Sequence, residues 1–234
     1  MSRRIALTLK TPAPARNNAA RSGRKFVTLG KRARISSAIL RGPYLPPERW
    51  YDPDEQLAGR FSVVVQQAGN GYRHVLTEQD IRRRLAQLPP WMTRPLQVVQ
   101  LSQMTLKKRR SPCYGMQWGN AVYLYPIEES LIETFNSPPK PAQRIEASMY
   151  GACWQQSGRH WHLVWTQDAI RDFYLNNVLI HELGHILDNR NNNARDRERF
   201  AEWFALEVGY KSSRNSNLAQ RAVNKYVVKR HDRS

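Results

Sequence analysis

The sequence predicts an α+β fold in which a twisted, mixed β-sheet packs on a buried helix, and a second, glutamate-bearing helix follows. Three observations lead to this prediction. Strand-like runs alternate with helical patterns up to residue 165, no proline interrupts the helical pattern from residue 168 to 189, and a second helical pattern spans residues 195–210. Apolar residues surround most of the first long helix, so we expect it to be buried on several sides. The length of 234 residues suits one medium-sized domain with extensions.

The expected strands precede this helix. Residues 61–67 and 72–76 flank Ala68-Gly69-Asn70-Gly71, a segment that favours a β-hairpin through its Asn-Gly pair. Further runs rich in β-branched and aromatic residues predict strands at 96–101, 121–125 and 160–165.

Helix and loop signals separate these strands. Thr77 can cap a helix over residues 78–88, which Pro89-Pro90 would end. The four consecutive basic residues 107–110 and the proline-rich residues 138–141 are expected to form exposed loops.

The long helix carries the motif His181-Glu182-Leu183-Gly184-His185. Residues four apart lie about one turn apart on the same helix face, so both imidazoles can reach one metal ion. Glu182 lies about 100° further around the helix and borders that face, within reach of a water bound to the ion. This spacing predicts one catalytic zinc ion (Zn2+) held by His181 and His185, with Glu182 as the general base.

The two histidines belong to a polar stripe on an otherwise apolar helix. Its members follow one another at steps of three, four, four and three: Tyr174, Asn177, His181, His185 and Asp188. A buried polar stripe costs free energy unless its members are paired or bind a metal. Thr166 or Asp168 can cap the start of this helix, and residues 189–193 are typical of a helix end and turn.

A catalytic zinc site needs a third protein ligand and leaves a fourth position for water. A third histidine in the pattern HExxHxxGxxH is excluded, because Asp188 and Asn191 stand at its glycine and histidine positions. If the chain reverses near Asn192 and the two helices pack antiparallel, residues 199–202 come level with the histidines.

The second helical segment supplies glutamates at this level. Glu198 and Glu202 share one helix face with small residues that would allow a close approach to the histidine helix: Ala201, Ala205 and Gly209. Glu207 points elsewhere and is expected to be a solvated charge.

The motif followed by Glu198-Arg199-Phe200-Ala201-Glu202-Trp203-Phe204-Ala205 resembles the gluzincin metallopeptidases, and within them the lethal factor-like peptidases of anthrax toxin and its bacterial relatives. The general gluzincin pattern ExxA[DE] also fits. The resemblance covers residues 178–210 and implies a zincin-like fold and a zinc metallopeptidase. It implies His181, His185 and Glu198 as metal ligands and Glu182 as the general base. Glu202 is implied to orient a ligand, and it stays an alternative third ligand because the spacing from His185 to Glu198 is short.

The implied substrate is a protein or peptide, cleaved by a zinc-activated water while Glu182 accepts and then delivers a proton. Tyr174 and Tyr210 are both candidates for a second donor to the oxyanion. Residues 119–125 are either an exposed edge strand that holds the substrate by backbone pairing or an ordinary sheet strand. Asp188 either accepts a hydrogen bond from a ligand imidazole or is solvated at the helix end.

Other metal-binding residue types lie outside the motif. Cys113 and Cys153 lack CxxC spacing and are expected to be buried free thiols. Deformylases combine HExxH with a cysteine ligand, but the sequence around Cys113 does not resemble theirs. His160 and His162 alternate on an expected strand, where a half-exposed strand face is favoured over a metal site.

The net charge of +18 is concentrated at the two ends of the chain. Residues 1–41 contain 11 basic and no acidic residues, residues 211–234 contain seven basic residues and Asp232, and residues 42–210 carry a net charge of +1. We therefore expect a disordered basic tail, a zincin-like catalytic domain and a basic C-terminal extension over these ranges. The tails either contact an anionic partner, such as nucleic acid or a membrane surface, by unspecific electrostatics or have no dedicated partner.

The sequence contains no secretory apolar region and no membrane-spanning run, so a cytoplasmic location is expected. The N-terminal tail also has the arginine-rich, acid-free character of an organellar transit peptide. The alternative to a peptidase is a non-proteolytic binding protein that keeps a zinc ion and contacts nucleic acid through its tails. Glu182 favours the enzyme, because a purely structural zinc site needs no carboxylate beside an open metal position.

Overall fold

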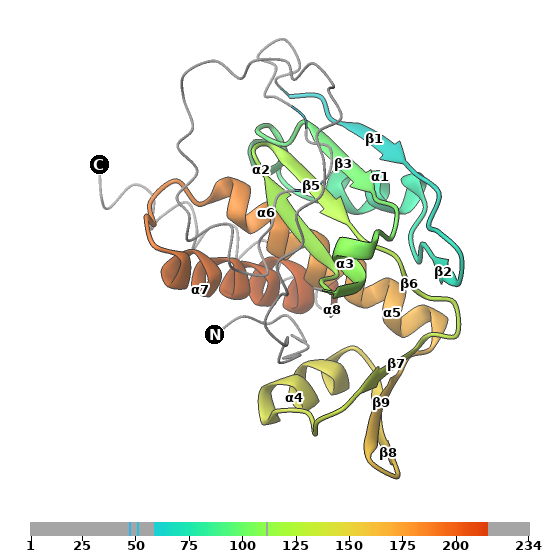
Figure 1. The fold of residues 1–234 in the computed structure, drawn as a ribbon. Coiled ribbons are helices and arrows are strands. Elements are labelled where there is room, and N and C mark those ends of the chain that lie inside the picture. Colours follow the sequence, from blue (N-terminus) through green and yellow to red (C-terminus); the bar gives the residue numbers. More distant parts are fainter. Residues whose placement is uncertain (1–46, 48–50, 52–58, 111, 215–234) are drawn as a thin grey trace, which may run out of the picture.

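The computed structural model describes Pro47, Tyr51 and residues 59–110 and 112–214, which form a mixed α+β fold (Figure 1). The largest sheet consists of β1 (Ser62–Val65), β3 (Val98–Leu101), β4 (Gly115–Trp118) and β5 (Ala121–Leu124). Its spatial order is β1-β3-β5-β4. The first three strands in this order are parallel, and β4 runs antiparallel to β5.

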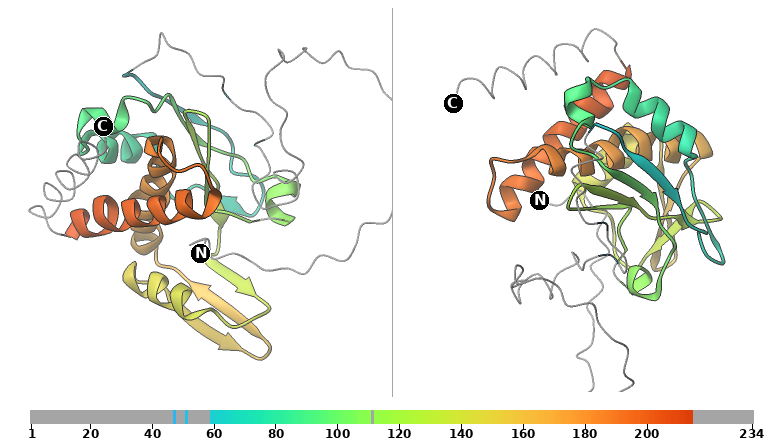
Figure 2. Two further views of the ribbon diagram at one scale, coloured as in Figure 1. Left: turned by 90° about the vertical axis from the view of Figure 1, so that its left-hand side faces the viewer. Right: turned by 90° about the horizontal axis from the view of Figure 1, so that it is seen from above.

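Two smaller sheets complete the strands. They are formed by β2 (Tyr72–Arg73) with β6 (Ile127–Glu128), and by β7 (Ile132–Phe135), β9 (His160–Val164) and β8 (Cys153–Ser157) in that spatial order. Helix α4 (Pro141–Met149) lies beside the three-stranded sheet, and Figures 1 and 2 show both below the main sheet.

Two long helical stretches follow the last strand. The first runs through α5 (Gln167–Phe173), the π-helical segment η3 (Tyr174–Val178) and α6 (Leu179–Leu187). The second runs through α7 (Ala194–Phe204), the π-helical segment η4 (Ala205–Lys211) and α8 (Ser212–Arg214). Three shorter helices precede them: α1 (Glu78–Ala86), α2 (Pro90–Thr93) and α3 (Leu106–Arg110). The expected long buried helix and the helix after it are therefore confirmed.

The main sheet is buried on both faces. Val99 and Val122 are fully buried and belong to the same core cluster as Leu179 and Leu183 of α6. On the other face Tyr123 is also fully buried, and Tyr51 stacks on it with ring centroids 6.4 Å apart. Burial of both faces is typical of sheets with parallel strands, and it fixes the sheet against α6.

Polar side chains mark the helix starts. Thr77, Thr166 and Asn193 each accept a hydrogen bond from the backbone N–H three residues later, at 3.2, 3.1 and 2.9 Å. Each bond satisfies one of the N–H groups that a helix start leaves without a partner. The predicted caps at Thr77 and Thr166 are confirmed.

The predicted β-hairpin is wrong. The backbone does turn at residues 68–71, where Tyr72 N donates to Gly69 O at 3.1 Å and Gly69 and Gly71 have positive φ. The flanking strands nevertheless do not pair with each other. β1 pairs in parallel with β3 and β2 pairs with β6, because long-range partners outside the local segment compete successfully for both strands.

The predicted exposed loop at residues 107–110 is also wrong. These residues belong to α3, and the side chain of Lys108 is buried at 2% exposure. Its ammonium lies 4.3 Å from the centroid of the Tyr125 ring and contacts the sulfur atoms of Cys113 and Met116 at 3.5 and 3.6 Å. A cation over an aromatic face is stabilised when it is removed from water, which accounts for the burial.

Most of the two predicted basic tails lies outside the described residues. At the C-terminal end, residues 211–214 continue the second helical stretch, where Lys211 pairs with Glu207 and Arg214 pairs with Asp172.

Within the described part of the chain, no helix combines the length and the apolar character that crossing a membrane requires.

The two long helical stretches pack against each other at unusually short range. A Cβ added at Gly209 would lie 1.9 Å from the carbonyl oxygen of Asn176, and one added at Gly184 would lie 3.1 Å from Ala201 Cα. Arg84 of α1 ties the two π-helical segments together, because it donates to Asn176 Oδ1 at 2.6 Å and to Val208 O at 2.9 Å. The expected close approach of the second helix is confirmed.

Replacing Gly209 by alanine is expected to destabilise the fold. The added methyl group would push η4 away from η3, and overpacking of this kind costs about 1–3 kcal/mol, with a backbone clash at the upper end. That cost exceeds the gain of about 1 kcal/mol in helix propensity. Urea unfolding of Gly209→Ala measures this loss of stability, with Ser213→Ala, at an exposed position, as the control. A Gly209→Ala variant as stable as the parent would show that the helices do not depend on this contact.

Candidate metal centre

Three side chains of the two long helices converge on one point. The Nε2 atoms of His181 and His185 lie 3.1 Å apart. Glu198 Oε2 lies 3.5 Å from the first nitrogen, and Glu198 Oε1 lies 3.6 Å from the second. All three side chains are buried, at 6–8% exposure. They form the one group of potential metal ligands detected among the described residues.

These distances fit a zinc ion. In a tetrahedral site with bonds of about 2.0–2.1 Å, neighbouring ligand atoms are about 3.3–3.4 Å apart. The two imidazole nitrogens are 3.1 Å apart, and each lies 3.5 or 3.6 Å from a different oxygen of the Glu198 carboxylate, which is close to that spacing. Two imidazoles and one carboxylate are also the donor set of a catalytic zinc site with one position left for water. His181, His185 and Glu198 would therefore hold the ion.

Local packing fixes the ligands. Gly184 lies between the two histidines in the motif, and its missing side chain lets α7 approach at Ala201. One turn before Ala201, Glu198 then faces the imidazoles. Arg197 donates to the backbone oxygen of His185 at 3.1 Å and so joins α7 to the end of α6.

Glu182 faces a small recess beside the ligands. The recess has a volume of about 30 Å3 and is lined by Tyr114, Gly115, Phe173, Asn177, Val178, His181 and Glu182. Strand β4 begins here, and a Cβ added at Gly115 would lie 2.6 Å from Val178 and 3.0 Å from Glu182 Oε1. A glycine at this position therefore lets the strand backbone pass close to the carboxylate, a role that glycine in a strand often has. Sequence reasoning missed Tyr114 and Gly115, although the lone glycine after Cys113 was a usable signal.

The other members of the polar stripe have protein partners. Tyr174 donates to the backbone oxygen of Tyr125 at 2.7 Å, and Asn177 donates to the buried Glu146 at 2.7 Å. Asp188 accepts bonds from the backbone N–H groups of residues 190 and 191 and from the Asn191 side chain, so it stabilises the turn after α6.

None of the remaining candidates belongs to the group of three ligands. Glu202 is not part of the ligand group, and its buried Oε1 has no hydrogen-bond partner among the described residues. Cys113 contacts Lys108 instead, and Cys153 is exposed rather than buried as expected. His160 and His162 lie on β9 and contact Asn136 and Thr134, as expected for a partly exposed strand face.

Two further points concern the sheet and the tyrosines. Residues 119–125, for which an edge strand and an ordinary sheet strand were both open, contain β5, which lies between β3 and β4, so the ordinary strand is confirmed; the outer strand on this side is β4. The two tyrosine candidates do not line the recess, because the Tyr174 hydroxyl is bonded to Tyr125 and the Tyr210 ring packs against Tyr150 and Arg214.

A larger cavity adjoins the recess. It has a volume of about 160 Å3, and Tyr114 lines both hollows. Glu133 of β7 lines the cavity and accepts bonds from the Tyr114 hydroxyl at 2.7 Å and from the Trp165 indole N–H at 2.9 Å, both through Oε2. Burial raises the pKa of Glu133 to about 7, because it outweighs these two bonds, which lower it, and nearby Glu128 raises it further. Burial likewise raises the pKa of Glu128.

No family model, curated protein or solved structure matches this chain.

Replacing Glu198 by alanine is expected to lower the zinc affinity far more than replacing Glu202. Loss of a partner outside the ligand set costs roughly 10- to 100-fold in metal affinity, and loss of a ligand costs more. Competition of each variant with a chromophoric chelator measures the difference. If Glu202→Ala loses zinc and Glu198→Ala retains it, the ligand assignment is wrong.

The raised pKa of Glu133 predicts a pH-dependent effect on stability. Between about pH 4.5 and 7 the folded chain binds more protons at this carboxyl than the unfolded chain, so its contribution to stability falls as the pH rises. Glutamine does not ionise, so Glu133→Gln does not lose stability in this way as the pH rises. Its free energy of unfolding relative to the parent should therefore increase by up to about 3 kcal/mol between acidic and mildly alkaline pH. Urea unfolding at both pH values tests this, with the exposed Glu129→Gln as control; a pH-independent difference would contradict it.

Proposed function

We propose that this chain is a zinc-dependent metallopeptidase with a zincin-like fold of the gluzincin type. The observation that carries the proposal is the position of Glu182, which faces a recess beside the point where His181, His185 and Glu198 converge. A ligand group alone would serve a structural metal. General-base chemistry needs, besides the metal ligands, a carboxylate that reaches the space beside the metal, and Glu182 meets this requirement.

Glu182 has two tasks in this proposal. A zinc ion held by the three ligands would supply a Lewis acid that lowers the pKa of a water and polarises the substrate carbonyl. Glu182 accepts the proton of the attacking water and then delivers it to the amine that leaves. The position of Glu182 is supported from the sheet side, where the backbone of Gly115 passes so close that an added Cβ would lie 3.0 Å from the Glu182 side chain.

Strand β4 is the proposed backbone partner of the substrate. Within the described part of the chain it is one of the two outer strands of the main sheet, and it is the one that begins beside Glu182. An extended peptide can add to such an edge through main-chain hydrogen bonds, and pockets for alternate side chains then provide specificity. This arrangement would hold the scissile bond next to the recess.

The alternative of a non-proteolytic zinc-containing protein that binds nucleic acid depends on the basic tails, most of which lie outside the described residues. Its distinguishing expectation is that zinc is bound but no peptide is cleaved. Glu182 would then have no chemical task.

Replacing Glu182 by glutamine is expected to abolish peptide hydrolysis and to leave zinc binding intact. Glutamine keeps the shape of the side chain but cannot accept the proton, and loss of a general base lowers the rate by about 100- to 10,000-fold. The parent, Glu182→Gln and the control Glu207→Gln are compared by zinc content and by cleavage of casein and a peptide library.

Zinc in all three proteins, with cleavage by the parent and the control only, supports the proposal. One zinc ion per chain without cleavage of any substrate by the parent favours the non-proteolytic alternative. Absence of zinc from the parent would refute the metal site itself.

A further inference from the structure

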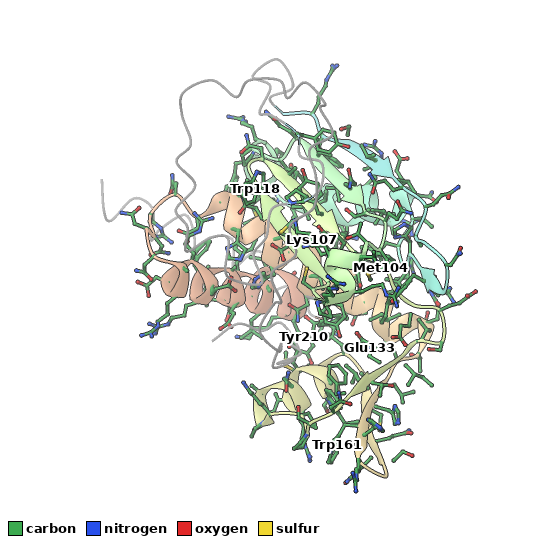
Figure 3. All side chains as sticks on the ribbon, viewed as in Figure 1. Met104, Lys107, Trp118, Glu133, Trp161 and Tyr210 are labelled. Carbon is green, nitrogen blue, oxygen red and sulfur yellow. The ribbon has the colours of Figure 1, made fainter. Side chains whose placement is uncertain are left out.

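The larger cavity lies within reach of a substrate bound at the recess. Tyr114 lines both hollows, and the next residue, Gly115, is the point at which β4 approaches Glu182. Consecutive residues are about 3.8 Å apart, so a peptide paired with β4 has a side chain near the cavity when its backbone is at the recess. Figure 3 shows Glu133 where the three-stranded sheet meets the rest of the domain.

The cavity is large enough for a long side chain. Its volume is about 160 Å3. An interior cavity of about 150 Å3 accommodates a guest as large as benzene. The size therefore fits an extended or planar side chain.

Two carboxylates line this cavity without a cationic partner. Neither Glu128 nor Glu133 forms an ion pair with a described residue. Both hydrogen bonds to Glu133 go to Oε2, and Oε1 accepts none from the described residues. Glu128 is exposed to solvent, whereas Glu133 is partly buried, and a carboxylate that is removed from water is normally paired, because its ionisation there is costly.

The two cations near the cavity do not neutralise these carboxylates. Lys108 directs its ammonium towards the Tyr125 ring and the sulfur atoms of Cys113 and Met116. Arg109 lines the cavity but is exposed and makes no ion pair with Glu128 or Glu133. The raised pKa values of both carboxyls agree with this, since an adjacent cation would lower them.

We propose that this cavity binds an arginine or lysine side chain of the peptide substrate, with Glu133 as its carboxylate partner. The proposal rests on the peptidase function argued above. A cationic guest would replace the missing counter-charge, and a hydrogen bond between two charged groups is stronger than one between neutral groups. An acidic side chain would meet two carboxylates, and an apolar one would leave them without a partner.

The first test uses the chain's own cysteines and needs no enzyme activity. Cys113 lines the cavity, and the exposed Cys153 on β8 serves as the internal control. Argininamide is expected to slow the alkylation of Cys113 by iodoacetamide and to leave Cys153 unchanged, whereas the uncharged isostere citrullinamide has no effect. In Glu133→Gln the same protection should require about 10- to 100-fold more argininamide, the range expected for loss of a hydrogen bond to a charged group.

Glutamine at position 133 keeps a hydrogen-bond acceptor for Tyr114 and Trp165. The matched control is Glu129→Gln, which removes an exposed charge next to Glu128. If Glu133→Gln fails to fold, the same shift is measured in Glu128→Gln. Equal protection by citrullinamide, or equal protection of parent and variant by argininamide, would overturn the proposal.

The second test is cleavage of peptide pairs that differ only in arginine or citrulline, with the substituted position moved along the peptide. At one position the parent should prefer arginine by about 10- to 100-fold in kcat/KM, and Glu133→Gln should lose this preference, whereas the exposed Glu129→Gln should keep both the preference and the rate on the citrulline peptide. Cleavage without charge preference at any position overturns the cavity assignment but keeps the peptidase. Protection of Cys113 without cleavage of any peptide keeps the binding site and refutes the peptidase.

Discussion

The close packing of the two π-interrupted helical stretches is the constraint on which the rest of the structure depends. At Gly184 and Gly209 the backbones approach so closely that a single added carbon would meet backbone atoms of the other helix. This distance decides whether Glu198 faces His181 and His185, because metal ligands must lie within a few tenths of an ångström of their positions. Each π-helical turn inserts a residue and so turns the following side chains by about 100°. The packing and the two insertions together select which face of each helix is presented to the other.

The charge distribution of the folded part differs from that of the whole chain. The chain carries a net charge of +18, yet residues 42–210 are nearly neutral. Within that part, four acidic side chains lie near the two hollows. Glu182 lines the recess, Glu198 pairs with His181, which also lines it, and Glu133 and the exposed Glu128 line the cavity. Carboxylates that line a hollow attract cations, which agrees with the proposed metal ion and the proposed basic side chain.

The sequence was most informative where local rules decide the structure. The helix caps at Thr77 and Thr166 and the long buried helix followed from side-chain chemistry and helix geometry. Geometry alone left both Glu198 and Glu202 open as the third ligand, and it was the resemblance that implied Glu198. The partner of β1 could not be predicted in this way, because parallel pairing joins segments that are distant in the sequence. The burial of Lys108 was equally hidden, because it depends on the Tyr125 ring and on two sulfur atoms that only the fold brings together. Near the candidate metal centre, the sequence pointed to residues on the helices but missed those that the sheet contributes.

The sheet also connects the cavity to the recess. Tyr114 donates its hydroxyl to Glu133 and packs edge-on against Phe173 and Tyr174, with ring centroids 5.1 and 5.8 Å away. At its neighbour Gly115, an added Cβ would lie 3.0 Å from the Glu182 side chain. A guest that ionises Glu133 strengthens the hydrogen bond from Tyr114, because a charged acceptor binds a hydroxyl more tightly than a neutral one. The same guest thereby holds the start of β4 against the carboxylate of Glu182. Two consecutive residues thus connect the cavity that would select the substrate to the group that would act on it.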